Sequence, residues 1–391
     1  MFYMAMKNYD FTQIPFNEIE SVGQKSLINR DLFCVSWLLG RYCNYSCSYC
    51  WPYASSKDKD HRSTELLTST MDEIKRQSRE RGFNSFHFSF SGGEPTLHKG
   101  YLDLLKHYAD DTLNTNYQSV HMTSNLSPGK FWFKKYLDVI KPFDKVSITA
   151  SYHHEFSDKQ KFCEKLLMLQ EEGVYITINI VMIPQSFKKL WIAAHFFHHA
   201  GLNVTLKPQS NPTATAVVDS YEPWMRELMK KGLPQQSKEK FRLRKSSVRN
   251  SKNLFDKLTE QEKLAVKKRG WKITDSFQVE MNTGSGKKWY MDQAERFNAF
   301  GFNNFNGWEC SSGYRSIIIR EPDGSIKRSY SCSDKPLGYI GKGFKLFDKP
   351  EPCISKSCVS SADSKIPKRK PGTRWPLYPK NINNQLNSAQ L

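Results

Sequence analysis

The sequence predicts an α/β fold in which six short strands alternate with helices, and three observations lead to it. Apolar or β-branched segments of strand length recur between residues 33 and 206. Helix-length segments with capping signals separate them, which is typical of βα units that form a parallel barrel or an open sheet. Polar motifs follow several of the strands, and ligands collect at the C-terminal ends of strands in such folds.

The expected strands are short, and most end at Gly, Pro or a polar motif. They cover residues 33–40, 86–90, 119–122, 145–149, 174–183 and 203–206. The segment 68–74 places hydroxyl groups three residues before carboxylates, a capping-box pattern that predicts a helix running to about Gly82. Later helices are expected to end at Gly173 and Gly201, because glycine readily adopts the left-handed conformation that follows a helix.

The first expected strand leads directly into three cysteines, Cys43, Cys47 and Cys50, spaced C-x3-C-x2-C. Three soft thiolate ligands on one loop suit an iron–sulfur cluster whose fourth iron stays open to another ligand. Two alternatives explain the same spacing. They are a zinc site that lacks its fourth ligand and three unrelated cysteines.

With 391 residues, 38% of them hydrophobic and 13% aromatic, the chain is long enough for two or three globular domains. No run approaches the roughly 18 apolar residues that span a membrane, and the first residues lack the basic region of a signal peptide. We therefore expect a cytoplasmic protein without a membrane partner, in which thiols stay reduced. Its nine cysteines are expected to be ligands or core residues before disulfides.

The formal net charge of +19 predicts affinity for anionic partners. Nucleic acid, a phosphorylated small molecule and an acidic peptide all fit, and the charge does not choose among them. Residues 221–272 carry more than half of the excess. This segment is either a solvated helical insertion or an anion-binding arm that clamps a substrate. The charge also predicts nonspecific nucleic-acid binding that salt weakens.

A second group of cysteines lies far downstream, in a segment with strand and turn patterns around Asp323-Gly324. It comprises Cys310, Cys332, Cys353 and Cys358. Four thiolates would fully ligate an iron–sulfur cluster and leave no open iron. A structural zinc in a four-cysteine site fits the same residues.

The motifs together support a resemblance to a known family. Cys43-x3-Cys47-x2-Cys50, with Tyr49 before the last cysteine, resembles the cluster motif of the radical S-adenosylmethionine (radical SAM) enzymes. The Gly92–Pro95 motif, Gly-Gly-Glu-Pro, resembles that family's second motif in its expected place after the second strand. The resemblance covers roughly residues 30–210 and implies a partial parallel (β/α)6 barrel.

The resemblance implies a particular chemistry. The three cysteines of the first motif would bind three irons of a 4Fe–4S cluster, and S-adenosylmethionine would take the open iron. An electron from the cluster would cleave the sulfonium and give a 5′-deoxyadenosyl radical, which abstracts a hydrogen from the substrate. A reductant such as flavodoxin or ferredoxin would supply that electron.

The family pattern also implies cofactor-binding positions at strand ends. These are Gly92, Gly93, Glu94 and Pro95, then Thr123, Ser124 and Asn125, then Ser147 and Ser151, and Asn179. The glycines would let the backbone approach the methionyl group closely, and Glu94 or a nearby carbonyl would accept from its ammonium. For each position an ordinary turn or in-sheet polar residue is the alternative.

His153 and His154 follow the fourth strand, where one of them is a candidate proton donor or acceptor for the substrate. The alternative is a polar loop cluster. The downstream cysteines resemble the auxiliary-cluster extension of the superfamily, called SPASM, in its shortened "twitch" form. That resemblance implies a second 4Fe–4S cluster, with zinc still open as an alternative.

The chain is expected to divide into five parts. An N-terminal extension at 1–30 precedes the radical SAM core at 31–212. A basic helical insertion at 213–295 and an auxiliary-cluster domain at 296–366 follow. The tail at 367–391 is rich in Lys, Pro, Asn and Gln, and is expected to be disordered.

The predicted function is that of a radical SAM enzyme that oxidises or cross-links a peptide or small-metabolite substrate. A closed auxiliary cluster fits oxidation, because it can accept the electron left on the substrate radical. One alternative is an RNA- or nucleotide-modifying enzyme, which the basic charge suggests. The non-enzyme alternative is an iron–sulfur electron-transfer or zinc-binding protein.

Overall fold

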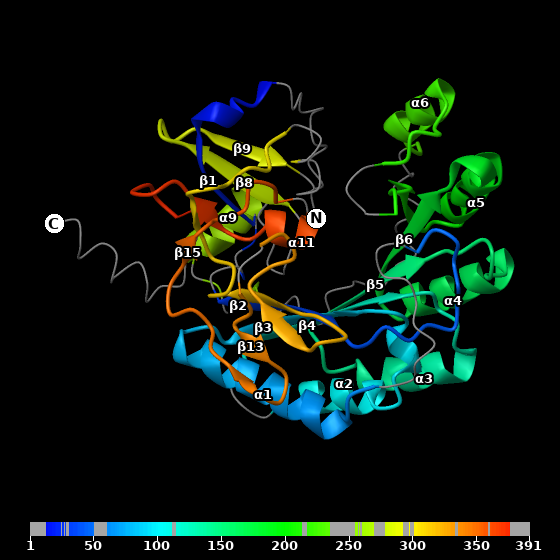
Figure 1. The fold of residues 1–391 in the computed structure, drawn as a ribbon, viewed down its shortest axis with the longest axis horizontal. Helices are drawn as coiled ribbons and strands as arrows, with labels where there is room; N and C mark the ends of the chain where they lie inside the picture. Colours follow the sequence, from blue (N-terminus) through cyan, green and yellow to red (C-terminus); the bar gives the residue numbers. More distant parts are fainter. Residues whose placement is uncertain are drawn as a thin grey trace.

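The computed structural model describes most of the chain, in segments. They are residues 13–24, 26, 28, 31–50, 61–111, 115–212, 217–234, 255, 256, 258, 260–269, 278–291, 297, 301–332, 335–358 and 360–375. These residues form two β-sheets, with helices packed along the larger one (Figure 1). Within this part of the chain, no helix has the length and apolar character needed to cross a bilayer.

The larger sheet is built on six parallel strands that pair in chain order. They are β2 (Leu32–Leu38), β3 (Ser85–Ser91), β4 (Tyr117–Ser124), β5 (Lys145–Ser151), β6 (Tyr175–Met182) and β7 (Asn203–Pro208). All six were predicted from the sequence, and the α/β fold class with a parallel sheet is confirmed. The sheet stays open, because β7 forms one edge and β14 (Gly343–Phe344) the other.

Helices connect these strands and lie along the outer side of the curved sheet (Figure 1). They are α1 (Thr64–Glu80), α2 (Tyr101–Ala109), α3 (Lys130–Val139), α4 (Lys159–Glu171) and α5 (Phe187–His199), with short 3-10 turns η4 (Pro95–Leu97) and η5 (Pro184–Ser186). The predicted start of α1 was too late. Ser63 caps the helix by accepting from the amide of Leu66. The hydroxyls of Thr68 and Thr70 lie inside the helix and donate to its own carbonyls.

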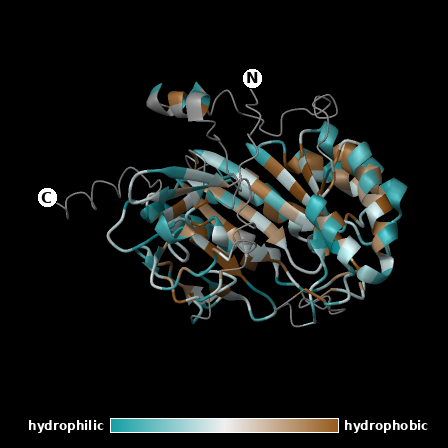
Figure 2. Cartoon of the chain, turned by 90° about the horizontal axis from the view of Figure 1, so that it is seen from above, coloured by the Kyte–Doolittle hydropathy of each residue, from teal (hydrophilic) through white to brown (hydrophobic). Residues whose placement is uncertain are grey.

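Aromatic side chains join the main sheet to α2. Phe88 packs edge-on against Tyr108 at 4.8 Å between ring centroids, and Phe90 packs against Tyr101 at 5.6 Å. Trp37 lies beside both phenylalanines, and all five side chains are buried. Burying each contributes about 1.5–3 kcal/mol. Figure 2 shows the resulting alternation of hydrophobic and pale positions along the strands.

The opposite face of the sheet, which we call the inner face, is polar. Side chains of successive strand residues point to opposite faces, so the neighbours of the buried aromatics lie here. In register across four strands these are Ser36, Ser89, His121 and Ser147. All four are only partly buried. The helices therefore cover one face of the sheet and leave a polar face free for ligands.

The smaller sheet combines segments from both ends of the described chain. Its order is β15 (Glu351–Pro352), β10 (Glu309–Cys310), β16 (Lys368–Arg369), β1 (Ile19–Gln24), β8 (Val279–Thr283) and β9 (Lys288–Met291). The pair β8–β9 forms a hairpin around residues 283–286.

Two parts of the expected domain division are wrong at this sheet. Residues 19–24 are not an extension outside the fold, because β1 is a largely buried strand that pairs with β8 and β16. Residues 367–375 are ordered, and β16 lies between β1 and β10. The rest of the expected tail, 376–391, lies outside the described residues, as do residues 1–12.

The C-terminal segment also joins the main sheet directly. Strand β11 (Ser316–Ile319) pairs in parallel with β2, and β12 (Ser325–Lys327), β13 (Gly338–Tyr339) and β14 extend the sheet in antiparallel fashion. A partly buried ion pair supports this junction, since Arg62 donates to the carboxylate of Glu321 at 2.6 Å and 3.0 Å. The segment with the downstream cysteines is thereby fixed against the strand that precedes the first cysteine motif.

The basic insertion is described only in part. It contains α6 (Pro223–Lys231) and α9 (Glu260–Arg269). Residues 235–254, where the positive charge is densest, lie outside the described residues.

Candidate functional site

Three cysteines follow β2 on one loop, at the C-terminal edge of the main sheet. Cys43, Cys47 and Cys50 are half-buried cysteines. The loop turns back on itself, since the amide of Cys50 donates to the carbonyl of Cys47 at 3.1 Å. Burial, together with the charges of Cys50, Glu155 and Cys43, raises the pKa of Cys47 to about 12. The three thiols therefore lie within electrostatic range of one another.

Gly92 and Gly93 bring the end of β3 against the backbone that leads into this loop. A Cβ on Gly92, whose φ is 136°, would lie 2.4 Å from the carbonyl oxygen of Gly40. One on Gly93 would lie 2.1 Å from that of Tyr42. The amides of Gly93 and Glu94 donate to these two carbonyls, both at 2.8 Å. The glycines were expected to make room for a cofactor, and the structure shows that they make room for the cysteine loop.

Glu94 ties the end of β3 to the end of β4. Its side chain is buried, and its Oε1 accepts from the amide and hydroxyl of Thr96 and from the hydroxyl of Ser124. Its Oε2 accepts from the amide of Asn125 at 2.6 Å. Burial raises the pKa of Glu94, and these hydrogen bonds oppose the shift. Pro95, also buried, begins η4 directly after it.

Asn125 connects this hub to the first cysteine. Its Nδ2 donates to Oδ1 of Asn44 at 3.0 Å and lies 3.8 Å from Sγ of Cys43. Its Oδ1 accepts from the amide of Ser127, which fixes the amide group in this orientation. The next residue, Leu126, has a φ of 55°, which non-glycine residues rarely adopt. The end of β4 is therefore shaped to hold an amide donor beside the Cys43 sulfur.

The loop after β5 grips the cysteine loop from the other side. His153 Nδ1 lies 3.2 Å from Sγ of Cys47 and 2.9 Å from the hydroxyl of Tyr49. Burial lowers the pKa of His153 to about 4. Glu155 accepts from the amide of Ser48 at 3.1 Å and from its hydroxyl at 2.5 Å. The loop from His153 to Glu155 thus contacts every residue from Cys47 to Tyr49.

His154 points elsewhere. Its Nε2 lies 3.1 Å from the hydroxyl of Ser186 in η5. The two neighbouring histidines therefore contact different elements, as expected for adjacent residues. A proton-transfer role for either one stays a prediction.

The remaining predicted cofactor positions fall into two groups. Thr123, Ser147, Ser151 and Asn179 alternate with buried apolar residues and lie on the inner face, and Ser151 is in register with Asn179. Ser124 points to the opposite face of the sheet, and its hydroxyl donates to Glu94. The prediction missed His121, whose Nδ1 lies 2.8 Å from the Ser147 hydroxyl. Its alternation with Val120 and Met122 was the available signal.

The downstream cysteines form a second, more buried centre. Cys310 lies on β10, and Cys353 and Cys358 follow β15; all three are at most 5% exposed. The backbone fixes two of them, because the amide of Cys353 donates to Trp308 and that of Cys358 to Asn303, both at 2.7 Å. Burial raises the pKa of Cys358 to about 12, and the charges of Cys310 and Cys353 contribute. These three thiols are also electrostatic neighbours.

The loop of Cys332 is tied to the same centre through hydrogen bonds. Oδ2 of Asp363 accepts from the amides of Tyr330 and Ser331 at 3.0 Å and 3.1 Å. Ser355, two residues after Cys353, donates its hydroxyl to the carbonyl of Ser331 at 3.1 Å. The fold therefore brings the loops of all four downstream cysteines together.

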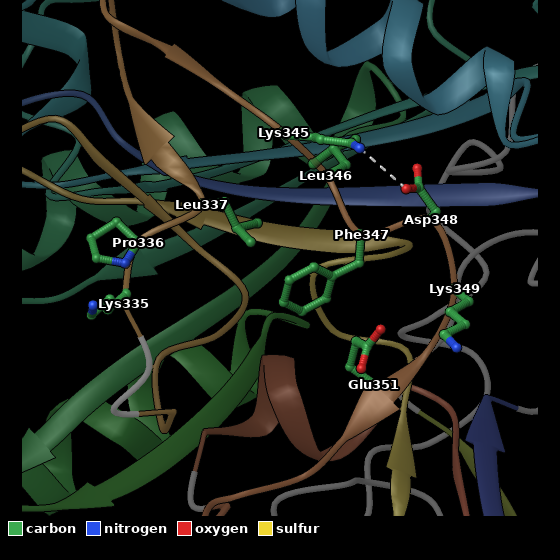
Figure 3. Close-up of a pocket in the computed structure, with 9 residues that line it drawn as sticks. All are labelled: Lys335, Pro336, Leu337, Lys345, Leu346, Phe347, Asp348, Lys349 and Glu351. Carbon is green, nitrogen blue, oxygen red and sulfur yellow. Dashed lines mark ion pairs between the residues drawn. The ribbon is translucent and has the colours of Figure 1, made fainter.

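A hollow of about 660 Å³ lies beside this centre (Figure 3). Leu337, Leu346 and Phe347 supply its apolar lining, and lysines stand at its rim. Lys345 pairs with Asp348 at 3.4 Å across the rim. The hollow is open and belongs to the same C-terminal segment as the second cysteine group.

Both cysteine groups fit iron–sulfur clusters by donor type, since thiolates are the ligands that such clusters use. Their placement also fits: the three half-exposed thiols stand at a strand end, and three of the four downstream cysteines are buried, while Cys332 is partly buried. Among the residues that the structure describes, no three His, Cys, Asp or Glu side chains converge closely enough to hold a single metal ion.

Comparison with known proteins gives one family match. Residues 37–197 match the family model described as the radical SAM superfamily. No curated protein matches the chain.

Several solved structures match the chain over part of its length at low identity. One is anSMEcpe with bound AdoMet, at 15% identity and a TM-score of 0.45, covering 79% of this chain and 78% of that one. Another is Streptococcus suis SuiB bound to S-adenosylmethionine, at 14% identity and a TM-score of 0.42, covering 78% of this chain and 63% of that one. A third is HydG, a maturase of the FeFe hydrogenase, at 13% identity and a TM-score of 0.31, covering 55% of this chain and 48% of that one.

The matched segment contains the features that define the site. It begins at the end of β2, includes the three-cysteine loop and the Gly92–Pro95 motif, and ends in α5. Enzymes of this family use a 4Fe–4S cluster and S-adenosylmethionine. The chain therefore contains a segment, residues 37–197, that matches the radical SAM superfamily.

Proposed function

We propose that the chain reductively cleaves S-adenosylmethionine at the Cys43–Cys50 loop and uses the radical to oxidise or cross-link a peptide or small metabolite. The observation that supports this most is the anchoring of the loop. Backbone from β3, an amide from the end of β4 and side chains from the loop after β5 all converge on it. Such anchoring holds three thiols in a fixed geometry beside the polar inner face.

The residues have separate roles in this proposal. Cys43, Cys47 and Cys50 hold three irons, and Asn125 orients the first sulfur. When bound, the cluster and S-adenosylmethionine supply a 5′-deoxyadenosyl radical that takes a hydrogen atom from the substrate. The polar positions of the inner face, Thr123, Ser147, Ser151 and Asn179, offer hydroxyl and amide groups for the ribose and methionyl parts.

Glu94 has a positioning role in this proposal. A carboxylate has about four lone-pair sites. Glu94 accepts three hydrogen bonds at Oε1, from Thr96 and Ser124, and one at Oε2, from Asn125. The side chain therefore positions Asn125 and the strand ends, and Oε2 can still accept from the ammonium of S-adenosylmethionine.

We further propose that Cys310, Cys332, Cys353 and Cys358 hold a second 4Fe–4S cluster. Its four thiolates leave no open iron, so it would move electrons and not bind the substrate directly. A radical left on the substrate after hydrogen abstraction can lose its electron to such a cluster. This supports oxidation or cross-link formation over a redox-neutral reaction. The enzyme also needs a one-electron donor such as flavodoxin or ferredoxin.

The direct test is anaerobic reconstitution with iron and sulfide, followed by dithionite and S-adenosylmethionine. We expect 5′-deoxyadenosine by chromatography, and none from the C43S, C47S or C50S variants. Cys163→Ala is a matched control, since Cys163 lies on α4 and is buried away from both centres. A reconstituted protein that forms no 5′-deoxyadenosine, or a C43S variant that forms it normally, would contradict the proposal.

The second centre needs its own readout. The Cys310→Ser variant should contain the iron of one cluster only, and the spectrum of the first cluster should stay unchanged. Zinc in the wild-type protein, with the iron of only one cluster, would contradict the second-cluster proposal and leave the first intact.

A further inference from the structure

A buried lysine lies beside the second cysteine centre. Lys368 is 1% exposed and stands on β16 directly opposite Cys310 on β10. Its ammonium donates to three backbone carbonyls, those of Asp363 at 2.6 Å, Ile366 at 2.9 Å and Ser364 at 3.4 Å. The carbonyls come from the turn that follows Cys358, so the side chain is held in place by all three of its donors.

The surroundings keep this lysine charged. Burial by itself lowers the pKa of Lys368, but the thiols of Cys358, Cys310 and Cys353, together with Asp363, outweigh that effect and raise it. The ring of Phe305, 5.0 Å from Nζ, adds an attraction that does not neutralise the charge. Lys368 is thus a fixed positive charge beside three of the cysteines.

Two other charged side chains near the centre form hydrogen bonds with the backbone. Arg328 is buried and donates to the carbonyls of Glu351 and Pro352, just before Cys353. Asp363 uses its Oδ2 on the backbone ahead of Cys332. Arg328 also donates to uncharged carbonyls and its charge acts on Cys353. Lys368 differs because it lies opposite Cys310 in the sheet and interacts with three of the thiols.

We propose that Lys368 sets the reduction potential of the cluster held by the second cysteine centre, raising it so that the cluster accepts electrons. The inference rests on the proposed second cluster. Reduction adds one negative charge to the cluster, and a nearby buried cation favours the more negative state. The low polarity of the buried site strengthens this interaction.

The test is potentiometric titration of the reconstituted full-length protein, with each cluster followed by its electron paramagnetic resonance signal. We expect Lys368→Met to lower the reduction equilibrium constant of the second cluster at least tenfold, about 59 mV for one electron. Lys368→Arg should stay near the wild-type value, and the first cluster should not change in either variant. Lys370→Met is the matched control, because Lys370 is two residues away and reaches the carbonyl of Asn17 instead.

Asp363→Asn gives an independent reading of opposite sign. The amide keeps an oxygen for the backbone donors but removes the negative charge, so the potential of the second cluster should rise. If Lys368→Met loses its iron, Asp363→Asn decides alone. A higher potential of the second cluster in Asp363→Asn supports the inference, and an unchanged potential overturns it. With both clusters present, an unchanged potential in Lys368→Met also overturns it. A wild-type protein with zinc in this centre would instead overturn the second-cluster proposal, and the inference with it.

Discussion

Replacing Gly93 with alanine tests whether the end of β3 holds the cysteine loop in place. The new Cβ would lie 2.1 Å from the carbonyl oxygen of Tyr42 and 2.4 Å from that of Arg41. Both are backbone atoms, so no side chain can rotate away. The two backbones must separate by roughly an ångström to reach the closest approach that real Cβ atoms show.

The expected magnitude follows from what that separation breaks. The amides of Gly93 and Glu94 donate to the cysteine-loop backbone at 2.8 Å, and both hydrogen bonds would be stretched out of range. Losing two such bonds costs about 1–3 kcal/mol, and overpacking adds about 1–3 kcal/mol. A domain with about 5–15 kcal/mol of stability survives this loss. The loop therefore shifts while the sheet stays folded, and the three thiols lose their common geometry.

The assay is iron and sulfide content after anaerobic reconstitution, with circular dichroism to confirm folding. Gly93→Ala should keep the secondary structure and lose the iron of the first cluster. Gly129→Ala is the control, because its Cβ meets nothing within 4 Å; as a helix N-cap change it should cost at most about 1 kcal/mol. A folded Gly93→Ala protein with wild-type iron content would refute the reasoning.

Three further changes test the supporting structure. Asp111→Asn breaks a buried ion pair with a lysine of α1 and should lower the free energy of unfolding by about 3–5 kcal/mol. Since burial is outweighed by that lysine and the pKa of Asp111 is lowered, the difference from wild type should shrink as pH falls through that pKa; a constant difference would contradict it. Arg62→Ala strands buried Glu321 and should cost about 1.5–3 kcal/mol in denaturant unfolding, whereas exposed Arg76→Ala should cost less than about 1 kcal/mol. Glu155→Ala should speed iron release to a chelator several-fold, and an unchanged rate would show that the clamp is dispensable.

The parallel strands were predictable because each carries its own local signal. In β5, for example, Val146, Ile148 and Ala150 are buried and alternate with polar residues. The three-cysteine spacing was equally local. Both depend only on residues close in the chain, which is why the strand order and the loop position agree with the sequence.

The rest depends on partners far apart in sequence. The contact of Glu94 with a cofactor stays a prediction, and the sequence did not indicate its hydrogen bonds from Ser124 and Asn125, about 30 residues later. Strand β1 pairs with β8, some 260 residues away, and nothing in Ile19–Gln24 marks that partner. Lys368 lies in a basic segment where a solvated side chain is the ordinary expectation. Its burial follows only from the register of β16 with β10.

The two cysteine groups differ in how they are held, and the difference follows from their proposed tasks. An open iron must admit a cofactor, so Cys43, Cys47 and Cys50 cannot all be buried and remain half-exposed. Their loop therefore depends on hydrogen bonds and close backbone contacts from neighbouring strand ends. A closed cluster needs no access, so Cys310, Cys353 and Cys358 can be buried. A single fixed charge acts strongly on buried thiolates. The need for access explains why hydrogen bonds from neighbouring loops hold the first site. Enclosure explains why a nearby charge can change the reduction potential of the second cluster.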